Sequence, residues 1–210
     1  MSRILYLQAS PRREKSTSIA IADAFVTACQ KKNPDDELTI INLFDKDLIP
    51  FDGNALEGKY NILQGNDYTP EQKAAWKQVE AEIAGFTAAD KYVFAVPMWN
   101  FSIPYRLKHY IDIIVQPGYT FSFSPEAGFS GLVTGKPAFV AYSRGNAYPA
   151  GSEMASMDMQ SPYVEKILKF IGFTDIRSVF LEPTLAEPDR VADNQAEAVE
   201  KARKMAEDFY

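Results

Sequence analysis

The sequence predicts one α/β domain with a five-stranded parallel β-sheet and helices on both of its faces. Short, nearly continuous apolar runs alternate with segments in which apolar residues recur at helical spacing. Such runs are typical of strands that are buried on both faces of a parallel sheet. The chain has 210 residues, of which 46% are hydrophobic, enough for a core of ordinary size. No repeat or linker-like tract divides the chain, so residues 1–210 are expected to form a single domain.

Five apolar runs are the predicted strands of the sheet. They are Ile4–Leu7, Leu38–Leu43, Tyr92–Val96, Pro137–Tyr142 and Ile176–Leu181. A helical segment follows each of them, and this alternation favours parallel strands joined by crossover helices. Two further short stretches, 120–123 and 131–133, are expected to pair as a small hairpin.

The predicted helices have recognisable starts and stops. The first contains apolar Ile19 to Cys29 and should end before Asn33-Pro34, because proline disfavours the helical conformation in the residue before it. The second starts at Thr69-Pro70, with threonine as the N-cap and proline at the first helical position. The others are Tyr105–Val115, Val164–Ile171, which ends at Gly172, and Asp189–Phe209.

Two segments are expected to be irregular. Residues 44–68 contain Pro50, Gly53, Gly58 and Gly65 and are predicted to be a long loop. Loops of that length in compact domains are usually functional or flexible. Residues 143–160 are expected to be a second loop rich in glycine and methionine.

Composition excludes several classes of function. The formal net charge is −6, whereas nucleic acids and anionic membranes require a basic face. One cysteine, Cys29, and one histidine, His109, argue against a metal site, and Cys29 is expected to be a small core residue. No apolar stretch is long enough for a signal peptide or a membrane span, so the expected location is the cytoplasm.

Three loops follow the predicted strands at the edge where parallel sheets bind ligands, which is outside the carboxyl ends of the strands. They are residues 9–18, residues 97–104 and the segment from Ser143 onward. We call them the first-strand, third-strand and fourth-strand loops.

The first-strand loop is rich in hydroxyl groups. It lacks both glycine-rich phosphate signatures, but Ser10, Ser16, Thr17 and Ser18 lie where a strand leads into a helix. The start of a helix offers unpaired N–H groups and a positive dipole end, which suit a single phosphate. The alternative is that Thr17 or Ser18 is a plain N-cap within a solvated turn.

The third-strand loop carries unusual apolar bulk. Met98, Trp99, Phe101 and Ile103 are grouped there, and an exposed loop does not normally carry such a cluster. A flat heteroaromatic ring would be covered by these side chains, while Asn100 and backbone amides could meet its polar edge. The alternatives are a hydrophobic plug over the sheet and a contact between subunits.

The sequence resembles the FMN-dependent NADH azoreductases, which also reduce quinones and have a flavodoxin-like fold. The matching motifs occur in the same order along the whole chain. They are Ser10 with Ser16-Thr17-Ser18, Pro97-Met98-Trp99-Asn100-Phe101, Leu107-Lys108 with Tyr110-Ile111-Asp112, Gly118-Tyr119-Thr120-Phe121, Gly131-Leu132-Val133-Thr134-Gly135-Lys136, Ser143-Arg144-Gly145 and Phe170-Ile171-Gly172-Phe173.

The resemblance implies a homodimer with one non-covalent FMN per subunit at the interface. NADH or NADPH would reduce the flavin, and quinones or azo compounds would reoxidise it by hydride transfer, without a catalytic side chain. The implied cofactor-binding residues are Ser10, Ser16, Thr17 and Ser18 for the phosphate, Pro97, Met98, Trp99, Asn100 and Phe101 for the ring, and Ser143, Arg144, Gly145 and Asn146 for its pyrimidine edge. The expected substrate-pocket residues are Tyr119, Phe121 and Phe170.

Two positions depart from the family pattern, and several alternatives stay open. Trp99 stands where tyrosine is usual, and Asn146 stands where the pattern has a second glycine. Arg144 is interpreted either as a contact for a substrate carboxylate or sulfonate or as a salt-bridge partner. His109 could be a general acid, but a solvent-facing or capped residue is the favoured interpretation. A flavodoxin-type electron carrier and a non-catalytic nucleotide-binding module are the competing functions.

Overall fold

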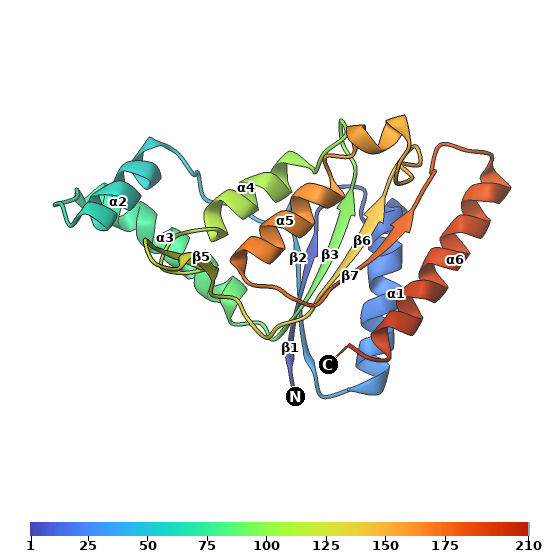
Figure 1. Ribbon diagram of the computed structural model, residues 1–210. Coiled ribbons are helices and arrows are strands. Elements are labelled where there is room, and N and C mark those ends of the chain that lie inside the picture. The colour runs from blue at the N-terminus through green and yellow to red at the C-terminus, as the bar shows by residue number, and fades with distance from the viewer. Residues whose placement is uncertain (210) are drawn as a thin grey trace.

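The chain forms a parallel sheet of five strands, and the computed structural model describes residues 1–209. The strand order is β2-β1-β3-β6-β7, seen at the centre of Figure 1. The strands are β1 (Arg3–Gln8), β2 (Glu37–Asn42), β3 (Lys91–Pro97), β6 (Ala138–Ser143) and β7 (Ile176–Leu181). All five predicted strands are therefore confirmed. Counting only these strands, the order is 2-1-3-4-5, that of flavodoxin-like doubly wound sheets.

Helices cover both faces of the sheet, so the molecule has three layers (Figure 1). On one face lie α1 (Thr17–Lys32) and α6 (Pro188–Ala206), and on the other α3 (Pro70–Thr87), α4 (Tyr105–Ile114) and α5 (Ser161–Ile171). Each face has its own buried apolar cluster. In the α1 layer, Phe25 stacks on Phe139 with ring centroids 3.8 Å apart. Cys29 is buried in the same cluster, as expected.

The predicted ends of these helices agree with the structure. Helix α1 ends at Lys32, directly before Asn33-Pro34. Thr69 caps α3 in a reciprocal capping box with Gln72. Gly172 follows α5 in the left-handed conformation, at φ 119°, which glycine adopts without steric penalty.

Residues 44–68 are not irregular throughout, and that prediction is wrong. They contain α2 (Gly53–Gln64). The Asp52 carboxylate accepts hydrogen bonds from the N–H groups of Asn54 and Ala55, and Gly65 ends the helix at φ 69°. Two of the glycines that indicated a loop therefore mark the ends of a helix. The third, Gly58, lies where a Cβ would be 3.0 Å from the Gln72 carbonyl oxygen, so it allows α2 to pack closely on α3.

The small hairpin exists with a shifted second strand. It pairs β4 (Phe121–Ser124) with β5 (Gly128–Gly131), so the predicted strand 131–133 starts three residues too late. Gly131 ends β5 against the end of α5, where a Cβ would meet the Gly172 backbone at 2.3 Å. Short 3₁₀ helices, Arg13–Lys15 and Glu153–Met157, lie inside the first-strand and fourth-strand loops. In residues 1–209, no helix has the length and apolar character needed to cross a membrane.

Candidate functional site

Three loops meet at the carboxyl edge of the sheet. Strands β1, β3 and β6 are neighbours, so the segments that follow them lie side by side. Pro97 and Ser143 are register partners, and the Met98 N–H donates to the Ser143 carbonyl at 2.8 Å. The chain leaves β1 for β2 on one side and reaches β3 on the other, so the strand order reverses between the first-strand and third-strand loops. Such a reversal is where doubly wound sheets bind ligands.

The first-strand loop places three buried hydroxyl groups at the start of α1. Ser10, Ser16 and Ser18 are 1%, 4% and 0% exposed, and the Ser16 and Ser18 Oγ atoms are 3.1 Å apart. Ser16 occupies the N-cap position, yet its side chain makes no capping hydrogen bond. The alternative that Thr17 or Ser18 is a plain N-cap is therefore wrong. The first N–H groups of α1 have no carbonyl partner within the helix, so this corner combines hydroxyl and amide donors for an anion.

The third-strand loop is a tight turn with a strained backbone. Trp99 and Ser102 exchange two backbone hydrogen bonds of 2.9 Å. The two residues between them have positive φ values, 48° at Asn100 and 67° at Phe101, which side-chain-bearing residues seldom adopt. Trp99 and Phe101 remain 37% and 41% exposed. A plug would bury these rings, so within one chain the loop does not seal the sheet.

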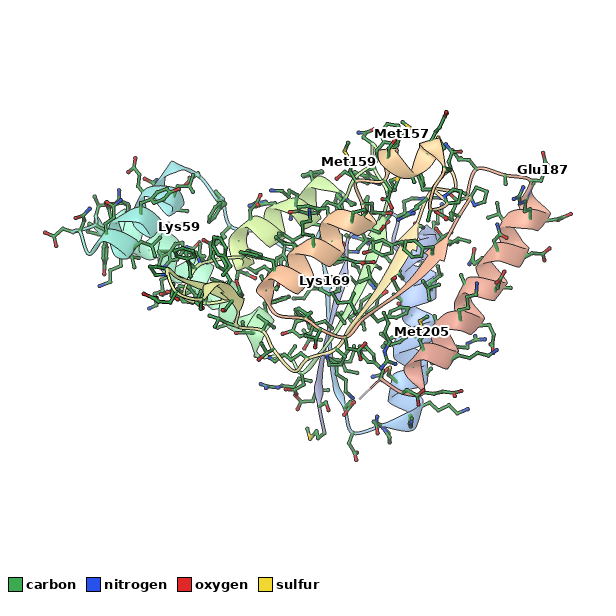
Figure 2. All side chains as sticks on the ribbon, in the orientation of Figure 1. Lys59, Met157, Met159, Lys169, Glu187 and Met205 are labelled. Atoms are coloured by element: carbon green, nitrogen blue, oxygen red, sulfur yellow. The ribbon has the colours of Figure 1, made fainter. Side chains whose placement is uncertain are left out.

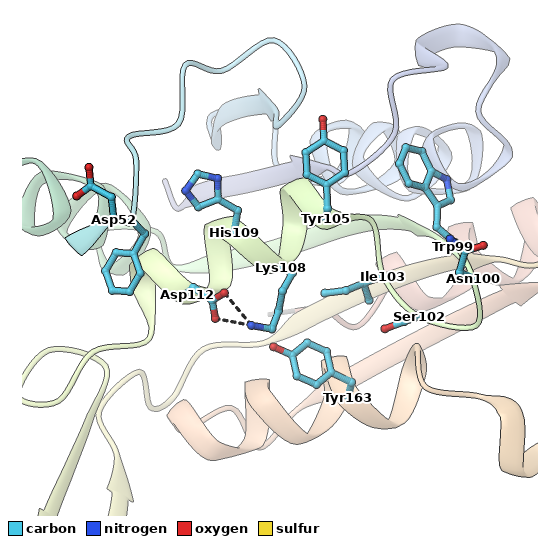
Figure 3. A pocket seen from close by; sticks show the side chains of 11 residues that line it. Asp52, Trp99, Asn100, Ser102, Ile103, Tyr105, Lys108, His109, Asp112 and Tyr163 are labelled. Atoms are coloured by element: carbon cyan, nitrogen blue, oxygen red, sulfur yellow. Dashed lines mark hydrogen bonds and ion pairs between the residues drawn. The ribbon is translucent and has the colours of Figure 1, made fainter. Parts of the chain in front are cut away.

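An open groove of 960 Å³ continues from this turn along α4 (Figure 3). Its aromatic lining residues come from the segment before α2 (Phe51), the third-strand loop (Trp99), α4 (Tyr105) and α5 (Tyr163). Across the groove, Tyr163 of α5 faces Lys108, whose Nζ lies 2.6 Å from Asp112 Oδ1. The lining residues are Phe51, Asp52, Trp99, Asn100, Ser102, Ile103, Tyr105, Lys108, His109, Asp112 and Tyr163.

His109 is held by the backbone rather than left free. Its Nε2 lies 2.9 Å from the Ile49 carbonyl oxygen, so this nitrogen carries the proton and donates. The interpretation as a capped histidine is confirmed. One ring nitrogen is thus committed to holding residue 49 beside α4.

The fourth-strand loop is largely buried at its start. Ser143 and Arg144 are 7% and 3% exposed. The Arg144 guanidinium lies 2.7 Å from Asp158 and 3.1 Å from Glu182, and its centre is 4.5 Å from the centroid of Phe180. The salt-bridge interpretation of Arg144 is confirmed, and its side chain is not available to a substrate carboxylate.

The three predicted substrate-pocket residues do not line the groove. The Tyr119 hydroxyl donates to Glu80 Oε1 at 2.5 Å, and both burial and this carboxylate raise the pKa of Tyr119. Phe121 and Phe170 pack on each other with centroids 4.7 Å apart. All three lie around the β4–β5 hairpin, so within one chain they are separate from the site at the sheet edge.

Three residues that line the groove, Phe51, Asp52 and Tyr163, were not predicted from the sequence. Asp52 had a usable signal, because an aspartate before a helical segment is a good N-cap, but the surrounding glycines masked it. Phe51 lies between residue 49, which His109 holds, and the start of α2, so no local pattern indicated that it lines the groove. Tyr163 had no local signal, since its position depends on how α5 packs against α4.

Comparison with known proteins agrees with the flavodoxin-like strand order of the sheet. The profile of a family described as Flavodoxin-like fold matches residues 2–206. An FMN-dependent NADH:quinone oxidoreductase from Nitratidesulfovibrio vulgaris is 53% identical over 210 residues, covering 100% of both chains. A protein of the same name from Desulfotalea psychrophila is 44% identical and covers 98% of both chains.

Solved structures give the same picture. An azoreductase from Bacillus anthracis superposes with a TM-score of 0.89 at 29% identity, covering 98% of this chain and 99% of its own. A second structure, an FMN-dependent NADH-azoreductase from the same species in complex with FMN, has a TM-score of 0.86 at 26% identity. It covers 98% of this chain and 100% of its own.

Proposed function

The chain belongs to the flavodoxin-like family of FMN-dependent NADH:quinone oxidoreductases, and from this membership we propose that it reduces quinones and azo compounds with NADH through bound FMN. In the quinone reaction, NADH and a proton are consumed, and NAD⁺ and hydroquinone are released. The observation that carries the proposal is the buried serine cluster at the start of α1. It follows β1, and the aromatic third-strand loop follows the neighbouring strand β3.

The serine cluster fits the phosphate of FMN. Ser10, Ser16 and Ser18 carry buried hydroxyls. Within residues 1–209, Ser10 Oγ accepts from the Arg12 N–H, and the Ser16 and Ser18 hydroxyls bind only each other. Hydrogen bonds to a charged phosphate are stronger than those between neutral groups, so these hydroxyls would bind an anion more strongly than a neutral ligand. Ser10, Ser16, Thr17 and Ser18 would hold the phosphate, and the dipole of α1 would add to its binding.

The third-strand and fourth-strand loops fit a flat ring. Met98 N–H is already committed to Ser143, whereas within residues 1–209 the N–H groups of Asn100 and Phe101 donate no hydrogen bond. The strained turn therefore leaves two adjacent donors for the polar edge of a ring that rests against Trp99. Pro97 and Met98 would line the ring, and Ser143 to Asn146 would approach its pyrimidine edge.

The chain contributes binding and orientation rather than acid–base chemistry. Bound FMN would supply the hydride-transfer chemistry between NADH and the acceptor. Trp99, Tyr105 and Phe51 give the groove flat apolar surface that suits nicotinamide, quinone and azo rings. Because one groove would receive both substrates in turn, NAD⁺ leaves before the acceptor enters, and plots of initial rates should give parallel lines. Intersecting lines would contradict this shared groove.

A homodimer is part of the proposal. The β4–β5 hairpin exposes Phe123, Phe129 and Leu132 by 61%, 63% and 46%, which favours a covered surface in the assembled protein. Tyr119 and Phe121 could form a substrate wall only over the groove of a second copy, because they do not reach their own. If the dimer completes the site, dilution to monomers should release FMN. An active monomer with bound FMN would contradict it.

The proposed compartment is the cytoplasm. The sole cysteine, Cys29, is buried and unpaired, as is usual for proteins of reducing compartments. Fractionation of the native cells, followed by immunodetection, tests this part of the proposal.

The first experiment is an absorption spectrum of the purified protein, followed by NADH oxidation with benzoquinone or methyl red, with and without added FMN. We expect a flavin spectrum, or activity restored by FMN, and NADH loss that depends on the acceptor. Flavin binding without NADH turnover would instead favour the electron carrier. A protein that binds no flavin would contradict both the cofactor and the activity.

A further inference from the structure

A short segment behind the site, residues 158–160, contacts both loops that are assigned to the flavin ring. It joins the 3₁₀ helix Glu153–Met157 to α5. Met157 and Met159 lie near the carboxyl end of the sheet, above the start of α5 (Figure 2). Neither Asp158 nor Gln160 lines the groove, so the segment supports the site from outside it.

Gln160 joins the two loops through one side chain. It is 0% exposed. Its Nε2 donates to the carbonyl of Val96, the residue before the third-strand loop, at 2.9 Å. Its Oε1 accepts from Arg144 Nε, in the fourth-strand loop, at 2.9 Å. The amide group therefore spans the two loops and satisfies a buried partner on each side.

The backbone next to Gln160 holds the far end of the third-strand loop. The Met159 N–H donates to the Phe101 carbonyl at 2.9 Å. Together with the bond to Val96, this contact holds the loop on both sides of the strained Asn100–Phe101 pair. A turn with two positive φ values persists only where its surroundings over-determine it, and residues 159 and 160 supply that support.

Asp158 keeps the segment and Arg144 in place. One of its carboxylate oxygens, Oδ1, accepts from the N–H groups of Gln160 and Ser161 at 2.9 and 3.1 Å. The other, Oδ2, accepts from the Ser161 hydroxyl and from Arg144, both at 2.7 Å. A planar guanidinium with several fixed donors can bind Gln160, Asp158 and Glu182 at once, so the rotamers of all these groups are coupled.

We propose that Gln160 is a positioning residue for this reaction, which fixes the third-strand loop relative to the fourth-strand loop and thereby sets how the flavin ring lies between them. The inference rests on the proposed function, because it needs FMN at these loops. Gln160 does not touch the substrates or the reacting atoms. It acts through Val96 on one side and through Arg144 on the other.

The test compares Gln160→Met with Gln116→Met, both reconstituted with FMN. Methionine keeps the length of glutamine and removes both hydrogen bonds. Gln116 is the control, because it is 1% exposed and donates its Nε2–H to the backbone carbonyl of Asp112 in α4, so it bonds to neither flavin loop. For Gln160→Met we expect the FMN dissociation constant to rise about tenfold, as for the loss of a buried hydrogen bond.

The decisive readouts are kcat at saturating FMN and the visible circular dichroism of the bound flavin. A residue that only stabilises the fold would lower the melting temperature and leave both unchanged. We expect kcat to fall about fivefold and the flavin dichroism to change in Gln160→Met, while Gln116→Met stays within about twofold of the wild type. Equal values of kcat and dichroism in the two variants would overturn the inference.

A second variant keeps the test decisive if Gln160→Met does not fold. Asp158→Asn has nearly the same shape, but it removes the charge that faces Arg144 and replaces one acceptor oxygen by an NH₂ donor. Because Gln160 itself is kept, the same changes are expected at about half the size on a logarithmic scale. Unchanged flavin dichroism and kcat in this variant would then overturn the inference. Failure of the proposed function is separate, because it shows as absence of FMN binding in the wild type.

Discussion

The first-strand and third-strand loops leave neighbouring strands and face the same crevice, yet they are built in opposite ways. The first presents small hydroxyls that are almost fully buried and lie at the start of α1. The third presents two large rings that are more than a third exposed, on a turn with two positive φ values. The two loops therefore offer different kinds of protein surface, one that suits a small, charged group and one that suits a large, flat group.

The two loops also differ in what holds them. The first-strand loop runs directly from β1 into α1, with Ser16 as the N-cap residue. Two contacts from the end of the neighbouring strand β2 and the residues after it support this loop: Asn42 Nδ2 donates to the Ser10 carbonyl at 3.3 Å, and Arg13 lies 2.7 Å from Asp45. The third-strand loop depends on distant segments. The ring centroids of Phe44 and Trp99 are 5.6 Å apart, and the Met159 N–H donates to the Phe101 carbonyl. We infer that the serines of the first-strand loop are placed mainly by the start of α1, whereas the strained turn of the third-strand loop relies more on tertiary contacts.

The largest expected effect comes from substitutions in the first-strand loop. Replacing Ser16 and Ser18 together by alanine removes two hydroxyl donors to the phosphate. Each hydrogen bond to a charged group contributes about 1.5–3 kcal/mol, so the FMN dissociation constant should rise about a hundredfold or more. Titration of the apoprotein by quenching of flavin fluorescence measures it.

Ser2→Ala is the control for the serine pair, because Ser2 lies before β1, at the opposite end of the sheet from the three loops. Its FMN affinity should equal that of the wild type. An unchanged affinity in the Ser16/Ser18 variant would remove the phosphate assignment and with it the contrast between the loops.

A smaller effect is expected at the turn of the third-strand loop. Asn100→Ala removes the side-chain amide and places alanine at φ 48°, so FMN affinity or kcat should fall about tenfold. Asn100→Gly removes the same amide but relieves the backbone. The difference between the two variants, measured by FMN titration and steady-state kinetics, separates the amide contact from the backbone conformation.

Asn66→Ala is the control, since Asn66 is an exposed asparagine that follows α2. It should leave both readouts unchanged. If Asn100→Ala and Asn66→Ala behave alike, the third-strand loop does not hold the ring.

The smallest effect is on stability, next to the fourth-strand loop. The Tyr142 hydroxyl is buried and, within residues 1–209, has no hydrogen-bond partner. Burial raises the pKa of Tyr142 well above its usual value, so the hydroxyl stays protonated and uncharged. Tyr142→Phe removes this unsatisfied group and should raise the free energy of unfolding by about 1 kcal/mol.

Tyr92→Phe provides the matched comparison in urea unfolding. Tyr92 is equally buried, but its hydroxyl donates to the Phe86 carbonyl at 2.7 Å, so this variant should lose about 1 kcal/mol. A loss of stability in Tyr142→Phe would mean that its hydroxyl has a partner in the complete protein.

The strands and most helices were predictable because their signals are local. Continuous apolar runs identified all five sheet strands, and Thr69-Pro70 and Asn33-Pro34 marked helix ends that the structure confirms. Helix α2 was missed because glycines at its two ends indicated a loop. The β5 strand was misplaced by three residues, since its position depends on the packing of Gly131 against Gly172 rather than on an alternating pattern.

Some parts of the candidate site could be predicted from the sequence and others could not. The serines of the first-strand loop and the aromatic third-strand loop were found from residue type and position after a strand. The role of Arg144 stayed open until Asp158 and Glu182 were seen beside it. Gln160 carried no signal, because a lone glutamine in a loop becomes informative only when both of its hydrogen-bond partners are known.

Local signals in the sequence were enough to predict the layered α/β fold and the three loops that face the crevice, because hydrophobic periodicity, caps and loop chemistry act within a few residues. The family followed from the resemblance of the ordered motifs to the azoreductases. Only the tertiary structure decided the shape of the groove, the paired state of Arg144 and the bridge made by Gln160. It also showed that Tyr119, Phe121 and Phe170 lie away from their own groove. These features arise between segments dozens of residues apart, where packing and buried hydrogen bonds, rather than local preference, select the arrangement.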